Sequence, residues 1–500
     1  MTETVAGLPL DAIARTVTEV EPNLKDRFDA AVVLEILGYK DADARALGYS
    51  TLFDLADAVK DAARPYAWEE PLRDPPRVRE SGLQLYLGGM FYNVGWMIML
   101  VALFMGGQSL WAARDMPVAV STAIGLGVVL GLVCTGGVQQ FAAWKLIYYH
   151  LQGNQPLSRF VMRKSLVLGG LLVLAVAGAF AVLAVAVIGL PLAIAGLGAG
   201  YLVLIGMYRL AVTPVFAMKK FVAMIAMSLA ALVAMFGTYH ILVAAGLDRV
   251  GAVVASQAVG LAILLAVSLL TMWAIVFAER EEVRRPEDPP FYARRELPKK
   301  VNPPRFWVLA LEGTPYLLYG TMYFIFLFAD RLVSWFGSQA GPYALNYNSA
   351  YQIGADLALL VLVPITAIKY PIIYRFSEFL ENRSKLSPSD RPEAFCRGVA
   401  AFHNGLTVRV AAASLTCVVV AYVLAPNLVG FAGGAADSVA VFRLSLIGVV
   451  LFSLFLSNAV FAMAFRRIGA MALLLVVAAV LNYVLAAAFV RTFRADAAVF

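Results

Sequence analysis

The chain has 500 residues, of which 61% are hydrophobic and 15% charged, whereas soluble globular domains are about 45–50% apolar and about 25% charged. Such an excess cannot be hidden in a water-soluble core, which excludes a cytosolic enzyme, a disordered chain and a disulfide-stapled secreted module. Three cysteines and three histidines are too scattered for a disulfide framework or a metal site, so no metal or cofactor is expected. The composition predicts a multi-spanning membrane protein.

The first 82 residues differ from the rest in charge. They carry 10 basic and 16 acidic residues, against 30 basic and 17 acidic in the remainder. The apolar spacing predicts a helix over 24–37 that stops at Gly38, and a second from a Ser50 N-cap to about Arg64. A Pro-rich linker follows. We predict that 1–82 is an acidic cytoplasmic helical module with a docking or regulatory role, for which a cytoplasmic synthase is a candidate partner.

Eleven apolar segments long enough to span a bilayer follow this module. The polar stretch 279–305 predicts a cytoplasmic linker between a first transmembrane bundle, 83–278, and a second, 306–500. The fold predicted is therefore all-α and polytopic, in two six-helix-type bundles, with a twelfth helix possible in a longer chain. Gly189-Leu190-Pro191 separates two spans, and Pro364 and Pro371 predict a kinked or broken eighth span. The segments are 85–107, 117–140, 165–189, 192–212, 221–245, 252–278, 306–336, 346–374, 399–425, 438–465 and 468–490.

Lysine and arginine are distributed unevenly between the loops. Alternate loops, counted from the N-terminal side, hold 23 of them, and the opposite loops hold only Arg114, Arg249, Arg491 and Arg494. The positive-inside rule therefore predicts a cytoplasmic N-terminus in a cell inner membrane. Because the basic residues follow the topology, no nucleic-acid partner is expected, and membrane lipids are.

A few polar side chains lie inside the predicted spans, where an ionisable group is expensive and usually faces a cavity or a partner. Glu312 and Asp330 are 18 residues apart, about five helical turns, so one continuous helix would place them on one face. The functional interpretation is a hydrophilic path for substrate or ions. The alternative places Asp330 and Arg331 at the water interface and lets Arg409 snorkel or pair locally. The predicted path residues are Asn93, Glu312, Asp330, Arg331, Asp356 and Arg409.

Aromatic residues crowd the seventh and eighth segments, and rings beside carboxylates are typical walls of sugar sites. An interfacial aromatic belt is the alternative. The Gly127–Gly131 and Gly196–Gly200 spacings predict close helix packing, and the absence of a GxxxxGK[ST] motif excludes ATP hydrolysis on this chain. The aromatic residues predicted to line the cavity are Tyr316, Tyr319, Tyr323, Trp335 and Tyr351.

A family resemblance rests on the stretch Phe326-Leu-Phe-Ala-Asp-Arg-Leu-Val-Ser-Trp-Phe336, continued by Tyr351, Pro364 and Tyr374-Arg-Phe-Ser-Glu-Phe-Leu-Glu381. Over about 306–425 the chain resembles the membrane exporters of Pel-type exopolysaccharide systems (PelG-like). Those exporters belong to the multidrug/oligosaccharidyl-lipid/polysaccharide (MOP) flippase superfamily. The resemblance implies two helical lobes around a central cavity, alternating access, and polysaccharide as cargo. The acidic module and the missing twelfth helix depart from that pattern.

The leading hypothesis is a transporter, not an enzyme, that exports or flips polysaccharide or lipid-linked oligosaccharide by alternating access during exopolysaccharide biosynthesis. A membrane glycosyltransferase or polymerase is the first alternative, although external loops of about ten residues leave little room for a catalytic loop. A scaffold that anchors a synthase complex is the second. A small-molecule antiporter on the same fold is the third, and differs only in cargo.

Overall fold

The computed structural model forms two compact units, Met1–Leu85 with Tyr370–Arg409, and Tyr86–Lys369 with Val410–Phe500. The predicted borders at 82, 278 and 305 stay predictions, and the predicted linker 279–305 lies outside the described residues. The structure describes residues 10–20, 24, 27–63, 81–92, 94–110, 112–114, 116–151, 155–278, 306–338, 340–386, 392–465 and 467–493.

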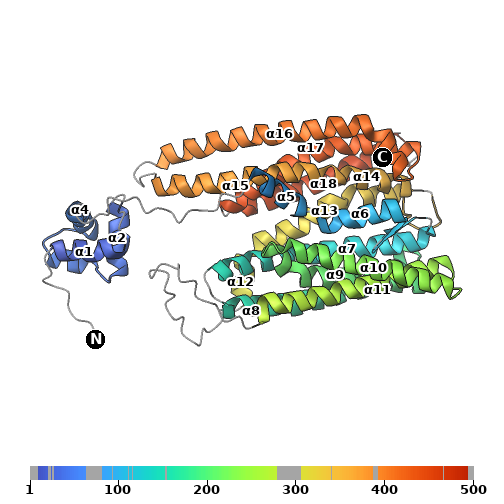
Figure 1. Cartoon of the computed structure of the whole chain (residues 1–500), viewed down its shortest axis with the longest axis horizontal. Helices are drawn as coiled ribbons and strands as arrows, with labels where there is room; N and C mark the ends of the chain where they lie inside the picture. Colours follow the sequence, from blue (N-terminus) through green and yellow to red (C-terminus); the bar gives the residue numbers. More distant parts are fainter. Residues whose placement is uncertain are drawn as a thin grey trace. The chain divides into compact units, whose positions relative to one another are not determined.

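Four short helices form the described part of the N-terminal module (Figure 1). Two of them match predicted helices, and Gly38 ends the first of these with a φ of +95°, as a helix stop requires. The second begins one residue later than predicted, because Thr51 and Asp54 cap each other's backbone N–H groups. The helices are α1 (Leu10–Val20), α2 (Arg27–Ile36), α3 (Asp41–Ala46) and α4 (Leu52–Ala63); their shared core contains Ile13, Val17, Leu34, Leu55 and Val59.

The described part of the first transmembrane bundle consists of long apolar helices and one two-stranded hairpin, in which Gln108 pairs with Ala113. Its elements are α5 (Gly82–Tyr92), α6 (Val94–Gly106), β1 (Gln108–Ser109), β2 (Ala112–Ala113), α7 (Val118–Leu151), α8 (Gln155–Leu183), η2 (Ala184–Ile188), α9 (Leu192–Ala217), α10 (Phe221–Ala244), α11 (Arg249–Met272) and η3 (Trp273–Phe277).

The described part of the second predicted bundle is entirely helical, and parts of its helices α15 and α16 belong to the first compact unit. Its elements are α12 (Phe306–Glu312), α13 (Thr314–Gly337), α14 (Ser349–Leu360), α15 (Leu362–Leu386), α16 (Pro392–Phe431), α17 (Ala436–Ala464) and α18 (Ile468–Phe493).

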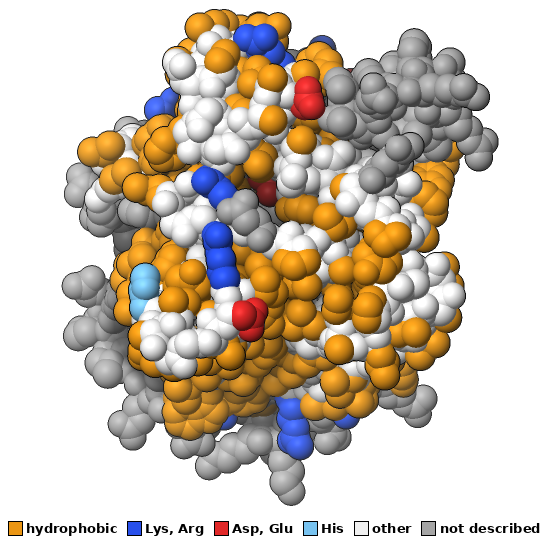
Figure 2. All heavy atoms as spheres, turned by 90° about the vertical axis from the view of Figure 1, so that its right-hand side faces the viewer, with side chains coloured by type: hydrophobic (Ala, Val, Ile, Leu, Met, Phe, Trp, Pro, Cys, Tyr) orange, Lys and Arg blue, Asp and Glu red, His pale blue; other side chains and the backbone are white. Residues whose placement is uncertain are grey.

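Ten helical segments in the described part of the chain are long and apolar enough to cross a membrane. They correspond to ten of the eleven predicted spans, so the chain is a polytopic α-helical membrane protein. The first predicted span, 85–107, falls on α5 and α6, between which Asn93 lies outside the described residues; within the described part of this span, Met97–Gly106 is a shorter apolar helix. Figure 2 shows the end of the molecule that carries the turns after α6, α10 and α16, where hydrophobic side chains predominate and Lys and Arg are few.

The predicted helix breaks are present. Gly189 ends η2 with a φ of +83°, a conformation that favours glycine, and separates α8 from α9. The eighth span breaks at Val361, three residues before Pro364. Proline lacks the N–H that would bond to the carbonyl of Leu360, and its ring would collide with that carbonyl. The break therefore follows from the sequence, whereas Pro371 lies inside α15.

The two bundles meet where α7 packs against α13. A Cβ atom on Gly320 would collide with the backbone carbonyl of Gly136, and one on Gly137 with that of Leu317. At one end of this seam Trp335 packs against Gly125, and at the other Phe141 packs against Gly313. The two backbones are thus in direct contact, which only glycine permits.

The glycine prediction for the first bundle is half correct. A Cβ atom on Gly127 would collide with the carbonyl of Gly198, so α7 and α9 do pack closely there. At Gly196 and Gly200 a Cβ atom would have no atom of another segment within 4 Å. The contact therefore uses the glycine between them, because successive helical residues point about 100° apart.

Gln257 fastens the hairpin to the first bundle. Its amide nitrogen donates to the carbonyls of Ser109 (2.6 Å) and Ala112 (3.0 Å), and its amide oxygen accepts from the Tyr201 hydroxyl (2.5 Å). The side chain is fully buried. These bonds account for the complete burial of a polar side chain among apolar helices.

We expect Gln257→Leu to lower the free energy of unfolding by about 3 kcal/mol, because the bonds to the Ser109 carbonyl, the Ala112 carbonyl and the Tyr201 hydroxyl would be lost at about 0.5–1.5 kcal/mol each. The measurement is the thermal unfolding midpoint of the detergent-solubilised protein. Tyr201→Phe is the matched control, since it removes one hydroxyl and should cost about 1 kcal/mol. An unchanged midpoint for Gln257→Leu would show that the clamp does not stabilise the fold.

Candidate functional site

The local sequence places a polar cluster between α13 and α14. Helix α13 is mostly apolar and aromatic, and its charged residues are the adjacent pair Asp330 and Arg331. After a loop, the side chain of Asn348 accepts a hydrogen bond from the backbone N–H of Tyr351 (3.1 Å) and so starts α14 as its N-cap. This cap fixes the position of Tyr351 at the beginning of α14, and Asp356 follows on the same helix.

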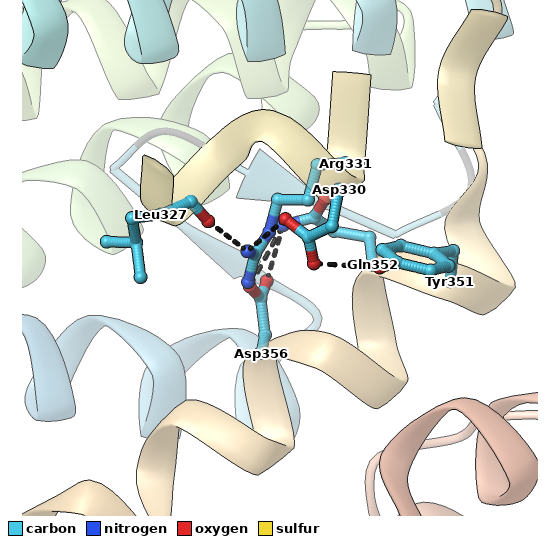
Figure 3. A network of polar contacts seen from close by, with 6 residues as sticks. All are labelled: Leu327, Asp330, Arg331, Tyr351, Gln352 and Asp356. Atoms are coloured by element: carbon cyan, nitrogen blue, oxygen red, sulfur yellow. Dashed lines mark hydrogen bonds and ion pairs between the residues drawn. The ribbon is translucent and has the colours of Figure 1, made fainter. Parts of the chain in front are cut away.

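Arg331 is the centre of the cluster (Figure 3). Its Nη2 donates to Asp356 Oδ1 at 3.0 Å, and its Nη1 donates to the carbonyl of Leu327 at 3.0 Å and lies 3.6 Å from Asp330 Oδ1. The Tyr351 hydroxyl donates to Asp330 Oδ2 at 2.7 Å. Gln352 Nε2 donates to both oxygens of Asp356, at 2.9 and 3.0 Å. Each carboxylate is therefore held by two side chains.

Burial and charge are unevenly distributed over the cluster. The Arg331 side chain is 3% exposed, while that of Asp330 is 32% exposed. Within the described residues, Asp330 Oδ1 and Arg331 Nε are buried and have no hydrogen-bond partner. With both carboxylates ionised the cluster carries one net negative charge. Buried charges are usually compensated, so this arrangement can accept a hydrogen-bond donor or a positive group beside Asp330.

A cavity of about 470 Å³ borders the cluster inside the second bundle. The charged and polar part of its wall is formed by Asp330, Arg331 and Tyr351. Further polar groups come from Ser445 on α17 and Asn482 on α18. The rest of the wall is formed by apolar side chains and a glycine: Phe326, Leu327, Val333, Ala355, Ala358, Leu359, Val441, Leu444, Gly448, Val449, Phe452 and Leu485. The cavity is thus amphiphilic and has the size typical of small-ligand sites.

A second ion pair lies at the other end of α13. Lys145 Nζ, on α7, is 2.6 Å from Glu312 Oε2, at the end of α12. The Lys145 side chain is 2% exposed and that of Glu312 is 57% exposed. The neighbouring Trp144 ring stacks on Tyr316, with the ring centroids 4.2 Å apart. This pair joins the two transmembrane bundles.

The structure brings three of the six predicted path residues together, namely Asp330, Arg331 and Asp356. Glu312 lies with Lys145 and does not border the 470 Å³ cavity. The helix is interrupted at Gly313, so Glu312 and Asp330 do not lie on one continuous helix as predicted. Arg409 is exposed on α16 and belongs to the other compact unit. Asn93 lies outside the described residues.

Among the predicted aromatic residues, Tyr351 borders this cavity and the others pack between helices. Trp335 is buried against Gly125 and tilted on Tyr347, with ring centroids 5.2 Å apart. Tyr316 and Tyr319 are buried in a cluster with α18, and Tyr323 packs on Phe452 (5.6 Å). Their role as an aromatic cargo wall stays a prediction.

Sequence reasoning missed Gln352 and the position of Lys145. Gln352 precedes Asp356 by four residues, a spacing at which helical side chains meet, so the signal was present. Lys145 is one of the 23 basic residues that the charge pattern assigns to loops, but α7 extends through it. Burial raises the pKa of Tyr347, in the loop before α14, and the Asp356 carboxylate raises it further, so this phenol stays protonated at neutral pH.

Within the described part of the chain, no group of three or more His, Cys, Asp or Glu side chains is placed to hold a metal ion. The cluster instead offers carboxylate oxygens and a phenol at the wall of a cavity. Such groups can bind hydroxyls, amines or a monovalent cation by hydrogen bonds and charge.

Comparison with known proteins gives structural neighbours only. No family model matches the sequence, and no curated protein matches it. The chain is similar to a MATE in complex with MaD5 (14% identity, TM-score 0.48), to the MATE transporter ClbM in complex with Rb+ (11%, 0.45), and to a MOP superfamily transporter from Pyrococcus furiosus (12%, 0.41). These matches cover 82–83% of this chain and 95–96% of theirs. Values this low do not bear on function.

Proposed function

We propose that the protein is a membrane transporter that exports or flips polysaccharide or a lipid-linked oligosaccharide by alternating access. The observation that carries the proposal is the 470 Å³ cavity inside the second bundle, with Asp330, Arg331 and Tyr351 on its wall. Ionisable groups within a membrane are expensive and commonly mark substrate or ion paths. Asp330 is the best-placed ligand, because it is the more exposed carboxylate of the cluster.

The chemistry of the wall favours a cargo with both polar and apolar parts. Asp330, Tyr351 and Asn482 can bond sugar hydroxyls, while the Phe326 and Phe452 rings, 5.9 Å apart, offer faces for the C–H side of a sugar ring. The remaining aliphatic wall suits a lipid chain. The resemblance to Pel-type exporters supports the same cargo class.

One observation favours a second cargo. The net negative charge of the cluster would suit an organic cation better than a neutral sugar, and this supports a small-molecule antiporter. For either cargo, we propose that transport is coupled to a proton or sodium ion that binds at Asp330, Asp356 or Glu312. The inner-membrane location, the cytoplasmic N-terminus and the docking of a synthase by residues 1–82 are part of the proposal.

The test uses full-length protein in liposomes with a fluorescent polyprenyl-diphosphate-linked disaccharide, and follows its movement between leaflets by dithionite quenching. We expect the protein to accelerate movement over empty liposomes, and Asp330→Asn to reduce the rate at least tenfold, because the substitution keeps the shape and removes the charge. Asp437→Asn, at an exposed residue at the start of α17 outside the cavity lining, is the matched control and should keep the native rate.

Two outcomes would count against the proposal. Equal rates with and without protein would contradict glycolipid flipping, and ethidium transport by the same liposomes would then support the antiporter. A native rate for Asp330→Asn would show that the cavity beside Asp330 is not the cargo site.

A further inference from the structure

We propose that Lys145 and Glu312 form a latch that holds the two transmembrane bundles together at one end of the α7–α13 seam and opens during the transport cycle. The inference rests on the proposed alternating access and adds a device that controls it. The pair joins α7 of the first bundle to α12 of the second through a contact of 2.6 Å. The loops at this end carry the basic excess, so we predict that the latch faces the cytoplasm.

Aromatic rings hold the lysine in place. Its Nζ lies 4.3 Å from the ring centre of Trp144, 5.7 Å from that of Tyr148 and 5.8 Å from that of Tyr149. Such rings attract an ammonium group through their negative faces. Trp144 in turn stacks on Tyr316 of α13. The same side chains that position the lysine therefore also connect the two bundles.

The Lys145–Glu312 pair differs from the Arg331–Asp356 pair in the way that a separable contact differs from a permanent one. Arg331 and Asp356 lie in one bundle, are mostly buried, and share further bonds with Leu327 and Gln352. Glu312 is more than half exposed, so water can replace its bond to Lys145 when the bundles move apart. Loss of that bond is thus much cheaper than loss of the Arg331 pair.

The backbone near Glu312 also fits a separable contact. The described part of α12, Phe306–Glu312, is followed by Gly313, whose missing side chain leaves room for Phe141 of α7. The latch is therefore the polar end of a contact that continues as apolar and glycine packing along α13. An opening at this end needs Lys145, Phe141 and Trp144 to leave α12 and α13 together.

The experiment measures the distance between the bundles by electron–electron resonance of spin labels at Ile147 and Trp307. Both side chains are exposed, and the native cysteines are replaced by alanine. In native protein without cargo we expect one short distance. Glu312→Gln and Lys145→Gln should increase a longer-distance population at least fivefold, within the usual range of such couplings. Lys164→Gln, at an exposed residue of α8, is the matched control.

Charge exchange completes the test. Lys145→Glu combined with Glu312→Lys should restore the short distance, whereas a role in packing alone would not be restored. The latch is refuted if both single variants keep the native distance distribution, or if they lengthen it and the exchange does not restore it. Glu312 is exposed, so Glu312→Gln keeps the test usable if a substitution at buried Lys145 prevents folding. Because no cargo is present, this result is independent of the Asp330→Asn flipping assay.

Discussion

Arg331→Leu is expected to lower the free energy of unfolding by about 3–5 kcal/mol, because it leaves Asp330 and Asp356 in a membrane bundle without their shared positive partner. Typical domains are stable by only about 5–15 kcal/mol, so little folded protein should accumulate. The measurement is the yield of monodisperse protein from membranes and its thermal unfolding midpoint in detergent.

Two variants make this expectation specific to the charge network. Adding Asp330→Asn and Asp356→Asn to Arg331→Leu should recover most of the stability, since a neutral cluster has no uncompensated charge. Arg443→Leu is the matched control, because the Arg443 guanidinium lies over the Tyr422 ring at 4.7 Å and has no carboxylate within 4.0 Å among the described residues. It should cost about 1 kcal/mol or less. A native midpoint for Arg331→Leu would contradict the structural role of the network.

Gly320→Val should separate α7 from α13 and reduce the free energy of unfolding by about 3 kcal/mol or more. Inserting methyl groups into a packed interior costs about 1–3 kcal/mol. Here the obstacle is the backbone carbonyl of Gly136, which cannot rotate away as a side chain can. The readout is again the thermal midpoint, together with the distance between the spin labels at Ile147 and Trp307.

Gly200→Val provides the comparison for this substitution. Gly200 is also a helical glycine in a membrane-spanning segment, but no atom of another segment lies within 4 Å of its Cβ position. The same substitution should therefore leave both midpoint and distance near native. If the two variants behaved alike, loss of helix flexibility rather than collision at the seam would be the cause.

Most of the fold could be predicted because each membrane-spanning helix is determined by its own stretch of sequence. A segment of about 20 apolar residues must satisfy its own backbone hydrogen bonds, so length and hydropathy identify it without its neighbours. The breaks at Gly189 and before Pro364 were equally local, since they depend on a left-handed φ and a missing N–H. Helix α3 was missed because it has only six residues, whereas the apolar face of α1, with Ile13, Ala14 and Val17, was a usable signal.

Individual residues of the site could be predicted, but the way in which they pair could not. The cost of a charge in a membrane identified Asp330, Arg331 and Asp356, but their pairing joins α13 to α14 across 25 residues and depends on packing. The partner of Glu312 lies 167 residues away on α7. A lysine at the end of an apolar segment is typical of a loop, and only the tertiary structure shows that Lys145 is buried beside aromatic rings.

The Gln257 clamp gives the molecule a mechanical asymmetry. Because one amide ties the hairpin after α6 to α9 and α11, a force applied to any of these elements is shared by the others. Helix α7 is continuous over 34 residues beside them, so we expect the first bundle to move as a rigid body. The other half contains the interruption at Val361, where α14 and α15 can bend against each other. We therefore expect the bundle that holds the charged cavity to bend at Val361.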